Sequence, residues 1–357
     1  MILNEFNEME DCLDYDDWSF ISGFESAGEE EVQPFTGRTK TAPEVTISFT
    51  AELLDHIQFT RYWQPRNMIP TIINLSVWFN QPRFRSGRKV KKAFRMSRSA
   101  FMKLLILIKD NLVFRNNSPC SPQTEVIYQL ATYLYHLGSK LAGGSLEQVG
   151  DTLGIGSGTV ISFCRRVVHA IHQLRCDFIK WPTVEEKIAH KQRVCAASKS
   201  VFSNCVGFVD GTFITLQYAP LKDWFFYYNR KASYALNAMV VCNDNQRILY
   251  IRAGDASAVH DTRVYANSQL SQRSDSFFND GEYLLGDSAY TPTEHMVPPF
   301  KKPRSANSDC RLFNAILSST RRITIEHVFG MLKAQFPSVT SVPIHITGDR
   351  SHQEVVA

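Results

Sequence analysis

The spacing of hydrophobic positions differs between the two halves of the chain. Before about residue 200, apolar residues recur every three or four positions, which is the period of an amphipathic helix. From Cys205 onward they form runs rich in β-branched and aromatic residues, which is typical of strands. The pattern predicts a helical region followed by a region built around a β-sheet.

Three helices are predicted in the first half outside the segment Ser145–Leu174. They cover residues 99–109, 123–141 and 184–198, and the last is interpreted as a connector to the second half. Ser97 is placed to cap the first of them. Its apolar stripe consists of Phe101, Leu104, Leu105 and Ile108.

The segment from Ser145 to Leu174 predicts a short helix, a tight turn at Gly154 and a second helix from about Gly158. This spacing fits a helix-turn-helix, in which Ile155 and Val160 pack the two helices together. The outer face of the second helix would then meet the major groove of DNA. The residues on that face are Thr159, Ser162, Arg165 and Arg166. A plain helical hairpin is the alternative.

The second half predicts a three-stranded antiparallel meander, a helix, a fourth strand and a long final helix. The strands cover 205–216, 233–242, 247–252 and 283–286, and the helices cover 260–270 and about 310–336. The fourth strand ends at Asp287. The buried side of the final helix is predicted to carry Leu312, Ile316, Ile323 and Leu332.

The net charge of +4 conceals a strong asymmetry. Residues 1–36 contain eleven Asp and Glu and no Lys or Arg, so the other residues carry 39 bases against 24 acids. The acidic segment, with its scattered aromatic residues, is predicted to be disordered. The basic remainder favours a polyanion such as nucleic acid as partner, and a soluble surface with excess lysine is the alternative.

A dense basic run lies at 83–92. It predicts contacts to phosphates or a nuclear import signal, and the alternative is an exposed loop without function. Its candidate DNA-binding residues are Arg88, Lys89, Lys91 and Lys92. The eight cysteines show no CxxC pair and no zinc-finger spacing, and we expect reduced thiols in an intracellular protein.

Three carboxylates of the second half are candidates for one site. Asp210 lies inside an apolar strand, where an unpartnered charge is costly, Asp287 ends the fourth strand, and Glu326 lies between apolar residues on the final helix. Carboxylates at one sheet edge repel each other unless cations bind between them, and oxygen ligands select Mg²⁺ or Mn²⁺. Two such ions about 4 Å apart would activate an attacking hydroxyl and stabilise the leaving oxygen of a phosphodiester. Arg322, one turn before Glu326, could hold that carboxylate, and Lys333 is placed to touch a phosphate.

The second half resembles the DDE catalytic domain of PIF/Harbinger transposases and of the domesticated Harbinger-derived nucleases. The similarity covers about residues 205–345, and the helical region also looks like what precedes this domain in the family. The matching blocks are Val209-Asp210-Gly211-Thr212, Tyr228-Asn229-Arg230-Lys231, Val259-His260-Asp261-Thr262-Arg263-Val264, Tyr283-Leu284-Leu285-Gly286-Asp287-Ser288-Ala289-Tyr290, Phe313-Asn314-Ala315 and Ile325-Glu326-His327-Val328-Phe329-Gly330-Met331-Leu332-Lys333.

This resemblance implies an RNase H-like fold in which Asp210, Asp287 and Glu326 are the metal-binding triad. It also implies DNA strand cleavage and, in active elements, joining of the 3′ ends to new DNA. His260 and Asp261 fall in the family's His-Asp block and are expected to support the site, although His260 could equally cap its helix. Family members usually continue through further helices, so a C-terminally truncated domain is expected.

The sequence thus predicts an α/β protein with an acidic tail (1–36), a helical DNA-binding region (37–200) and an RNase H-like endonuclease domain with a mixed sheet flanked by helices (201–357). We expect a metal-dependent DNA endonuclease or transposase. The alternative is a transposase-derived DNA-binding protein that does not cut, and an RNA-cleaving relative of RNase H is a third reading. The expected partners are double-stranded DNA, a separate DNA-binding accessory protein and further copies of the chain. We expect a nuclear location, with the cytoplasm as a second one, and no membrane partner, because no apolar run approaches the length of a membrane helix.

Overall fold

The computed structural model describes residues 75–81, 86–115, 123–139, 145–342, 346–348 and 352, all of which belong to one compact unit, Met68–Ala357. The acidic segment 1–36 and residues 37–74 lie outside the described residues, as do 82–85 of the basic run. Among the helices that the structure describes, none is both long and apolar enough to span a bilayer.

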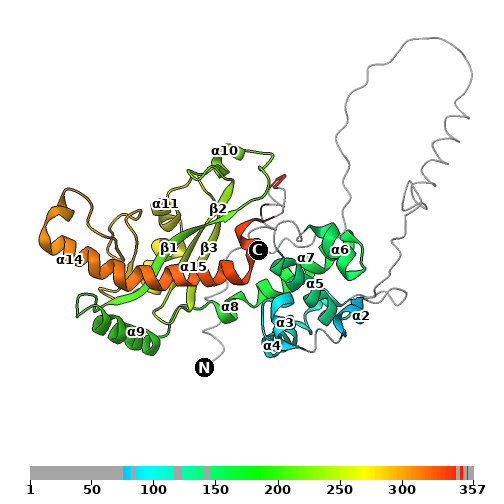
Figure 1. The fold of residues 1–357 in the computed structure, drawn as a ribbon. Coiled ribbons are helices and arrows are strands. Elements are labelled where there is room, and N and C mark those ends of the chain that lie inside the picture. The colour runs from blue at the N-terminus through cyan, green and yellow to red at the C-terminus, as the bar shows by residue number, and fades with distance from the viewer. Residues whose placement is uncertain are drawn as a thin grey trace, which may run out of the picture. The chain divides into compact units, whose positions relative to one another are not determined.

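The helical region packs around a core of its own (Figure 1). The helices that form it are α2 (Leu75–Phe79), α3 (Gly87–Phe94), α4 (Arg98–Ile108), α5 (Val126–Gly138), α6 (Leu146–Leu153) and α7 (Ser157–Gln173). The stripe predicted on α4 is confirmed, because Phe101 and Ile108 are buried and Leu104 and Leu105 pack against the same core. Ser97 caps α4 by accepting a hydrogen bond from the backbone N–H of Ala100.

The helix, turn and helix predicted at 145–174 are present as α6 and α7. Gly154 has φ 69°, a left-handed conformation that glycine adopts without strain, and it ends α6. Val160 is buried and Ile155 is half-buried against the same core, as expected. A role of this helix pair in binding DNA stays a prediction.

The second half contains a mixed five-stranded sheet with the order β3-β2-β1-β4-β5. The strands are β1 (Cys205–Thr215), β2 (Ala235–Cys242), β3 (Ile248–Ala256), β4 (Tyr283–Leu285) and β5 (Met296–Val297). The predicted antiparallel meander is confirmed, since β2 pairs antiparallel with both β1 and β3. Parallel pairing of β4 with β1 and β5 completes the sheet.

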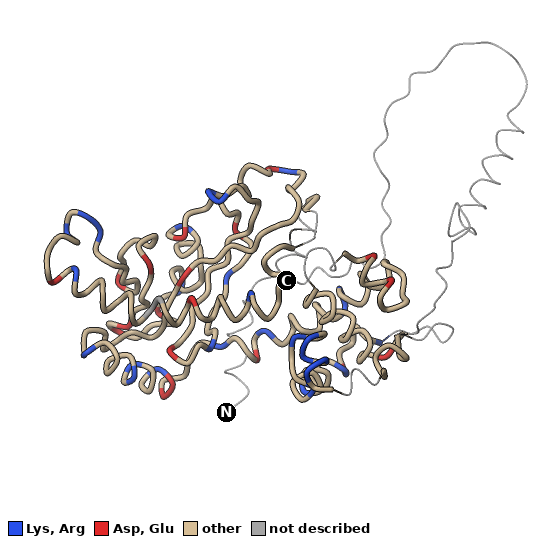
Figure 2. Tube along the Cα trace, viewed as in Figure 1, with Lys and Arg blue, Asp and Glu red and all other residues tan. Residues whose placement is uncertain are grey.

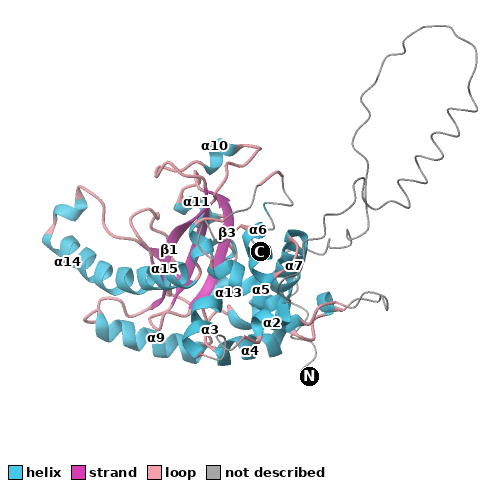
Figure 3. Ribbon diagram, turned by 45° about the vertical axis from the view of Figure 1, so that its right-hand side comes forward, coloured by secondary structure: helices cyan, strands magenta, loops and turns pink. Residues whose placement is uncertain are grey.

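Helices cover both faces of this sheet (Figure 3). One face packs against the segment with α11 (Asp261–Ala266), α12 (Gln269–Gln272) and α13 (Ser274–Phe277). The other face packs against α9 (Val184–Ala197), α14 (Ser308–Leu317) and α15 (Ile323–Gln335). The remaining short helices are α8 (Arg175–Phe178) and α10 (Trp224–Tyr227).

Two sequence predictions for these helices are corrected by the structure. The helix predicted at 260–270 is interrupted at Asn267 and Ser268, between α11 and α12. On the final helix Leu312 and Ile323 are exposed, whereas Leu317, Ile325 and Val328 are buried. A π-helical turn at Ser318–Arg322 joins α14 to α15. Because a π turn inserts an extra residue, it rotates the positions that follow it, which accounts for Ile323 but not for Leu312, which precedes the turn.

The helix interpreted as a connector is a full part of the sheet domain. Val194 of α9 lies in the same core cluster as Phe208 of β1. Lys187 of α9 forms a buried ion pair with Glu282, the residue that precedes β4. The helix therefore fixes the end of the sheet at which β1 and β4 begin.

Candidate active site

Asp210 in the middle of β1 and Asp287 just after β4 lie where the parallel pairing of these two strands stops. Phe208 of β1 pairs with Leu285 of β4, and each aspartate lies two residues beyond that pair. The chain stays extended past β4, because the backbone N–H of Gly286 still donates to Val297 of β5. Neighbouring strands lie about 4.8 Å apart, so the register brings these two carboxylates side by side at the point where β4 ends and β1 continues along β2.

Each aspartate is half-buried, and its side chain accepts a hydrogen bond from the backbone of a residue just after it. The backbone N–H of Gly211 donates to Oδ1 of Asp210 over 2.9 Å, and that of Ala289 donates to Oδ1 of Asp287 over 2.7 Å. Gly286 allows Met296 and Tyr290 to pack closely against the backbone, because a Cβ there would lie 2.8 Å from Sδ of Met296 and 2.9 Å from the Tyr290 ring. Local hydrogen bonds thus orient both carboxylates while leaving acceptor positions on their oxygens.

The third candidate carboxylate comes from the helix that covers the same face of the sheet. Ile325 and Val328 of α15 pack in one cluster with Phe208 and Leu285. Glu326, next to Ile325, is exposed. It lies seven residues, or two helical turns, before Lys333, so both side chains follow one side of the helix.

Lys333 connects that side of α15 to β1. Its ammonium donates to Oγ1 of Thr212 over 2.7 Å and to the carbonyl oxygen of Phe213 over 3.3 Å. Thr212 lies two residues beyond Asp210 and points to the same face, since side chains alternate along a strand. Burial and the charge of Lys231 lower the pKa of the Lys333 ammonium. Lys333 was predicted to touch a phosphate, and two of its three N–H donors are given to β1 here.

The His-Asp block lies against the opposite face of the sheet. Oδ1 of Asp261 accepts a hydrogen bond from Nδ2 of Asn237 over 2.9 Å, and a Cβ on Gly211 would lie 2.7 Å from this oxygen. The Gly211 position faces away from Asp210, its neighbour along the strand. The next residue, Thr262, donates to the carbonyl oxygen of Ala289 over 2.7 Å and so holds the turn after Asp287.

His260 directly precedes α11, and Arg322 directly precedes α15. His260 is exposed at the N-cap position of α11, where its side chain makes no capping hydrogen bond. Arg322 ends the π-helical turn one turn before Glu326, and its side chain lies outside what the structure describes. The predicted ion pair between Arg322 and Glu326 therefore stays a prediction.

The donor set suits a hard divalent cation, because carboxylate oxygens are the ligands that Mg²⁺ and Mn²⁺ prefer. Asp210 and Asp287 are the side chains that the fold brings together most directly. Across residues 75–342, apart from the gaps given above, no three His, Cys, Asp or Glu side chains are gathered closely enough to hold a metal ion. Three carboxylates repel one another unless a cation lies between them. The fold thus supplies a pair of aspartates, with Glu326 on the helix that runs over their face.

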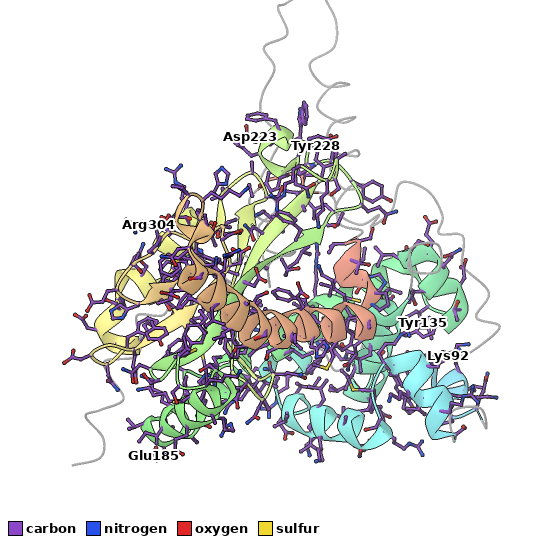
Figure 4. All side chains as sticks on the ribbon, turned by 60° about the vertical axis from the view of Figure 1, so that its left-hand side comes forward. Lys92, Tyr135, Glu185, Asp223, Tyr228 and Arg304 are labelled. Atoms are coloured by element: carbon purple, nitrogen blue, oxygen red, sulfur yellow. The ribbon has the colours of Figure 1, made fainter. Side chains whose placement is uncertain are left out.

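The predicted DNA-binding residues lie on two helices of the helical region. On α7, Thr159, Ser162 and Arg165 are exposed and Arg166 is half-buried. On α3, which is a helix and not a loop, Val90 and Phe94 face the core. The exposed positions of α3 are Arg88, Lys89, Lys91 and Lys92, and Figures 2 and 4 show this basic face and its Lys92.

Two features near the site were not assigned a role from the sequence. Lys231 lies close enough to Lys333 for its charge to act on it, and Trp224, Phe225, Phe226 and Tyr228 are about half exposed. The signal was present in the sequence, because Lys231 belongs to a motif and the aromatic run directly precedes it. Neither motif nor run shows which of its side chains are exposed, since that depends on the fold.

Comparisons with known proteins identify relatives of this chain. Residues 209–357 match the family model described as DDE superfamily endonuclease. The human protein named "Putative nuclease HARBI1" is 25% identical over 217 residues, which are 60% of this chain and 58% of that protein. Its Xenopus laevis counterpart is 23% identical over 66% of this chain and 65% of that protein. "Protein ALP1-like" of Arabidopsis thaliana is 24% identical over 60% of this chain and 56% of that protein.

The matches thus span less than two thirds of each of these relatives. No solved structure is significantly similar to the chain. The family model begins one residue before Asp210 and contains Asp287 and Glu326, so all three candidate carboxylates lie inside the matched domain. The chain carries a DDE superfamily endonuclease domain at residues 209–357 and is related to the Harbinger-type DDE transposases and the nucleases derived from them.

Proposed function

We propose that the chain is a divalent-metal-dependent endonuclease of transposase type that cuts phosphodiester bonds of double-stranded DNA. The observation that carries the proposal is the register of β1 and β4: Phe208 pairs with Leu285, and Asp210 and Asp287 each follow two residues beyond that pair, where β4 ends. Ligand sites of α/β sheets lie at such strand ends. The sheet order and the flanking helices agree with an RNase H-like fold, which we propose for this domain.

In this proposal Asp210, Asp287 and Glu326 hold one or two Mg²⁺ or Mn²⁺ ions. When bound, these ions make the attacking water or hydroxyl more acidic and stabilise negative charge on the leaving oxygen. Asp261 and Thr262 act as positioning residues, because Asp261 accepts a hydrogen bond from Asn237 of β2 and Thr262 donates one to the turn that follows Asp287. Lys333 contributes positive charge beside the same strand, where a DNA phosphate can replace part of its contact with β1.

DNA binding is proposed for two surfaces outside the endonuclease domain. The exposed face of α7 presents Thr159, Ser162 and Arg165 beside Arg166, and α3 presents four exposed basic residues. Such contacts to phosphates weaken as salt displaces them. The basic run is also proposed as a nuclear import signal. We further propose a homo-oligomer and a separate DNA-binding accessory protein as partners.

The test is cleavage of a labelled duplex by the purified full chain with Mg²⁺, compared with the same reaction in chelator. Cleavage that needs the metal and disappears in Asp287→Asn is the expected result. Asp280→Asn is the matched control, because Asp280 is an exposed acid just before the same strand and its exchange makes the same charge change. Cleavage that survives in Asp287→Asn would exclude this triad.

The alternative function is DNA binding without cleavage. It is favoured by the absence of a preformed three-carboxylate cluster in the described part of the chain. Retained binding to duplexes with terminal inverted repeats, together with no metal-dependent nicking by the folded wild type, would select it. A strong preference for RNA–DNA hybrids over duplex DNA would instead select an activity like that of RNase H.

A further inference from the structure

An aromatic segment leaves the sheet at the same end as the candidate carboxylates. Residues 216–234 connect β1 to β2 and contain seven aromatic residues. Five of them are at least 39% exposed: Tyr218, Trp224, Phe225, Phe226 and Tyr228. Aromatic side chains of this size are usually buried, so a group of exposed ones marks a binding surface.

Five of the rings contact one another in a chain, which the 6.3 Å contact between Trp224 and Phe225 joins, and we call them the aromatic platform: Trp224, Phe225, Phe226, Tyr228 and Tyr234. The rings of Phe225 and Phe226 lie 4.2 Å apart between centroids. Tyr234 joins Trp224 at 6.3 Å and Tyr228 at 5.3 Å. Figure 4 shows Asp223 and Tyr228 at the outer end of this segment, and Figure 1 shows α10 above the sheet.

Backbone hydrogen bonds hold the platform in place. The carbonyl oxygen of Phe226 accepts from the N–H of Ala258 over 3.0 Å, and that of Tyr227 accepts from Oγ of Ser257 over 2.6 Å. These two anchors directly precede the His-Asp block. On the other side, the N–H of Leu221 donates to Ile346 over 3.0 Å. The platform is therefore presented in a fixed position next to the start of α11.

The charge around the platform is positive. Residues 216–234 contain Lys222, Arg230 and Lys231 and only one acid, Asp223. All three basic side chains are exposed, and blue segments flank α10 in Figure 2. The turn that carries two of them is fixed, because Oδ1 of the buried Asn229 accepts from the N–H of Lys231 over 2.8 Å and from Oγ of Ser233 over 3.1 Å.

This combination points to nucleic acid rather than protein as the occupant. Interface cores between proteins are poor in lysine, whereas proteins that bind single strands combine aromatic rings with basic side chains. The rings stack on bases and the basic groups follow the phosphates. Stacking requires an unpaired base, because the faces of paired bases are covered by their neighbours in the duplex.

The position of the platform determines how many nucleotides of bound DNA separate the aromatic rings from the candidate carboxylates. Thr215, the last residue of β1, lies five positions after Asp210, which is about 17 Å along the strand. That distance corresponds to about five stacked nucleotides. Lys333 links the two parts of this surface, because its ammonium donates to Thr212, two residues beyond Asp210, and the charge of Lys231 from the connecting segment acts on it.

We propose that the aromatic platform stacks the unpaired bases of a single-stranded DNA flank about five nucleotides from the phosphate that the carboxylates act on. The proposal rests on the proposed function in that it takes DNA as the substrate of this site. It adds a substrate class, namely duplex DNA with an unpaired end or bubble. Lys222, Arg230 and Lys231 hold the phosphates of that flank.

The test compares the affinity of the full chain for two fluorescent duplexes by anisotropy, in chelator so that no cleavage occurs. One duplex is fully paired and the other carries a five-nucleotide single-stranded flank. The wild type is expected to prefer the flanked duplex about tenfold for each base stacked. Trp224→Ala with Phe225→Ala is expected to lose that preference while its affinity for the paired duplex stays unchanged.

Two further variants make this test specific. Trp224→Phe keeps a ring and is expected to retain most of the preference. Phe178 of α8 is 57% exposed, about as much as the platform residues. Phe178→Ala is therefore a matched control and is expected to leave the preference for the flanked duplex unchanged. Equal affinity of the wild type for both duplexes would overturn the proposal, as would an unchanged preference in the double variant.

The remaining outcomes separate this proposal from its alternatives. If the double variant keeps the preference but falls apart from a dimer to a monomer in light scattering, the platform is a protein interface and the proposal is wrong. Failure of the proposed function gives a different result, because a chain that never cleaves can still prefer the flanked duplex. Cleavage by the wild type without any flank preference would reject the platform alone.

Discussion

The two ends of the β1–β4 strand pair carry acids with opposite surroundings. At the end where the strands begin, Glu282 is 1% exposed and accepts from Lys187 over 2.8 Å and from Lys191 over 2.6 Å. Burial alone would raise the pKa of Glu282, but hydrogen bonds from the Asn279 backbone and the two lysines lower it to about 2.

At the end where the strands finish, Asp210 and Asp287 accept hydrogen bonds from the backbone N–H groups of Gly211 and Ala289. Within the described residues, Asp287 forms no ion pair of the kind that Glu282 forms. A carboxylate neutralised by lysines of the protein stabilises the fold and is closed to a metal ion. A carboxylate oriented by backbone amides can still bind an external cation, as the proposed endonuclease site requires.

The largest expected effect comes from removing the charge of an acid that backbone amides orient. Asp210→Asn should reduce metal-dependent DNA cleavage about a thousandfold or more, because one of the proposed metal ligands is lost. Its free energy of unfolding should change by less than about 1 kcal/mol, as is usual away from buried networks. Cleavage assays and urea titrations of the same preparation measure both. A loss of several kcal/mol with activity intact would reverse the comparison.

The converse variant is Glu282→Gln. It leaves the buried ammonium of Lys187 without its counter-charge, and breaking a buried pair costs about 3–5 kcal/mol. Urea denaturation measures this loss of unfolding free energy, and Asp280→Asn, two residues away and exposed, should cost less than about 0.5 kcal/mol. Where Glu282→Gln still folds, its cleavage rate should remain within a few-fold of the wild type. A stability equal to that of Asp280→Asn would contradict the role given to the ion pair.

The pH dependence of stability sharpens the same contrast. Because the folded pKa of Glu282, about 2, lies below the ordinary value, its stabilising contribution is complete above about pH 4.5 and is lost as the pH falls toward 2. In this window the wild type should lose up to about 1.4 kcal/mol more per pH unit than Glu282→Gln. Urea titrations of both proteins between pH 5 and pH 3 measure the difference. Parallel curves would show that Glu282 is not held ionised in the folded state.

A smaller effect is expected at the second acid that α9 binds. Asp244 accepts from Nδ1 of the buried His190 over 2.6 Å and pairs with the half-exposed Arg193. Burial would raise the pKa of Asp244, but these hydrogen bonds lower it. Asp244→Asn should cost about 1 kcal/mol, because the amide keeps one hydrogen bond and solvent screens the arginine. Thermal unfolding measures this loss of stability. A loss as large as that of Glu282→Gln would mean that the stability each network contributes does not depend on how exposed it is.

Local features of the fold could be predicted from the sequence by itself. Ser97, Ser145 and Thr183 cap their helices, as short polar side chains directly before a helical segment usually do. Gly154 ends α6. The strands of the meander follow from runs of β-branched and aromatic residues. These features depend on neighbours within a few positions, so a pattern along the chain contains the information that determines them.

The tertiary structure decided what depends on distant residues. It brought Glu282 to Lys187 across 95 positions, and it set the parallel register that places Asp287 beside Asp210. It also placed Asp261 beneath the opposite face of β1 and rotated the stripe of the last helix through a π turn. Spacing predicts that a strand or helix exists but not which strand it pairs with, because register and packing are selected by the burial of all elements together.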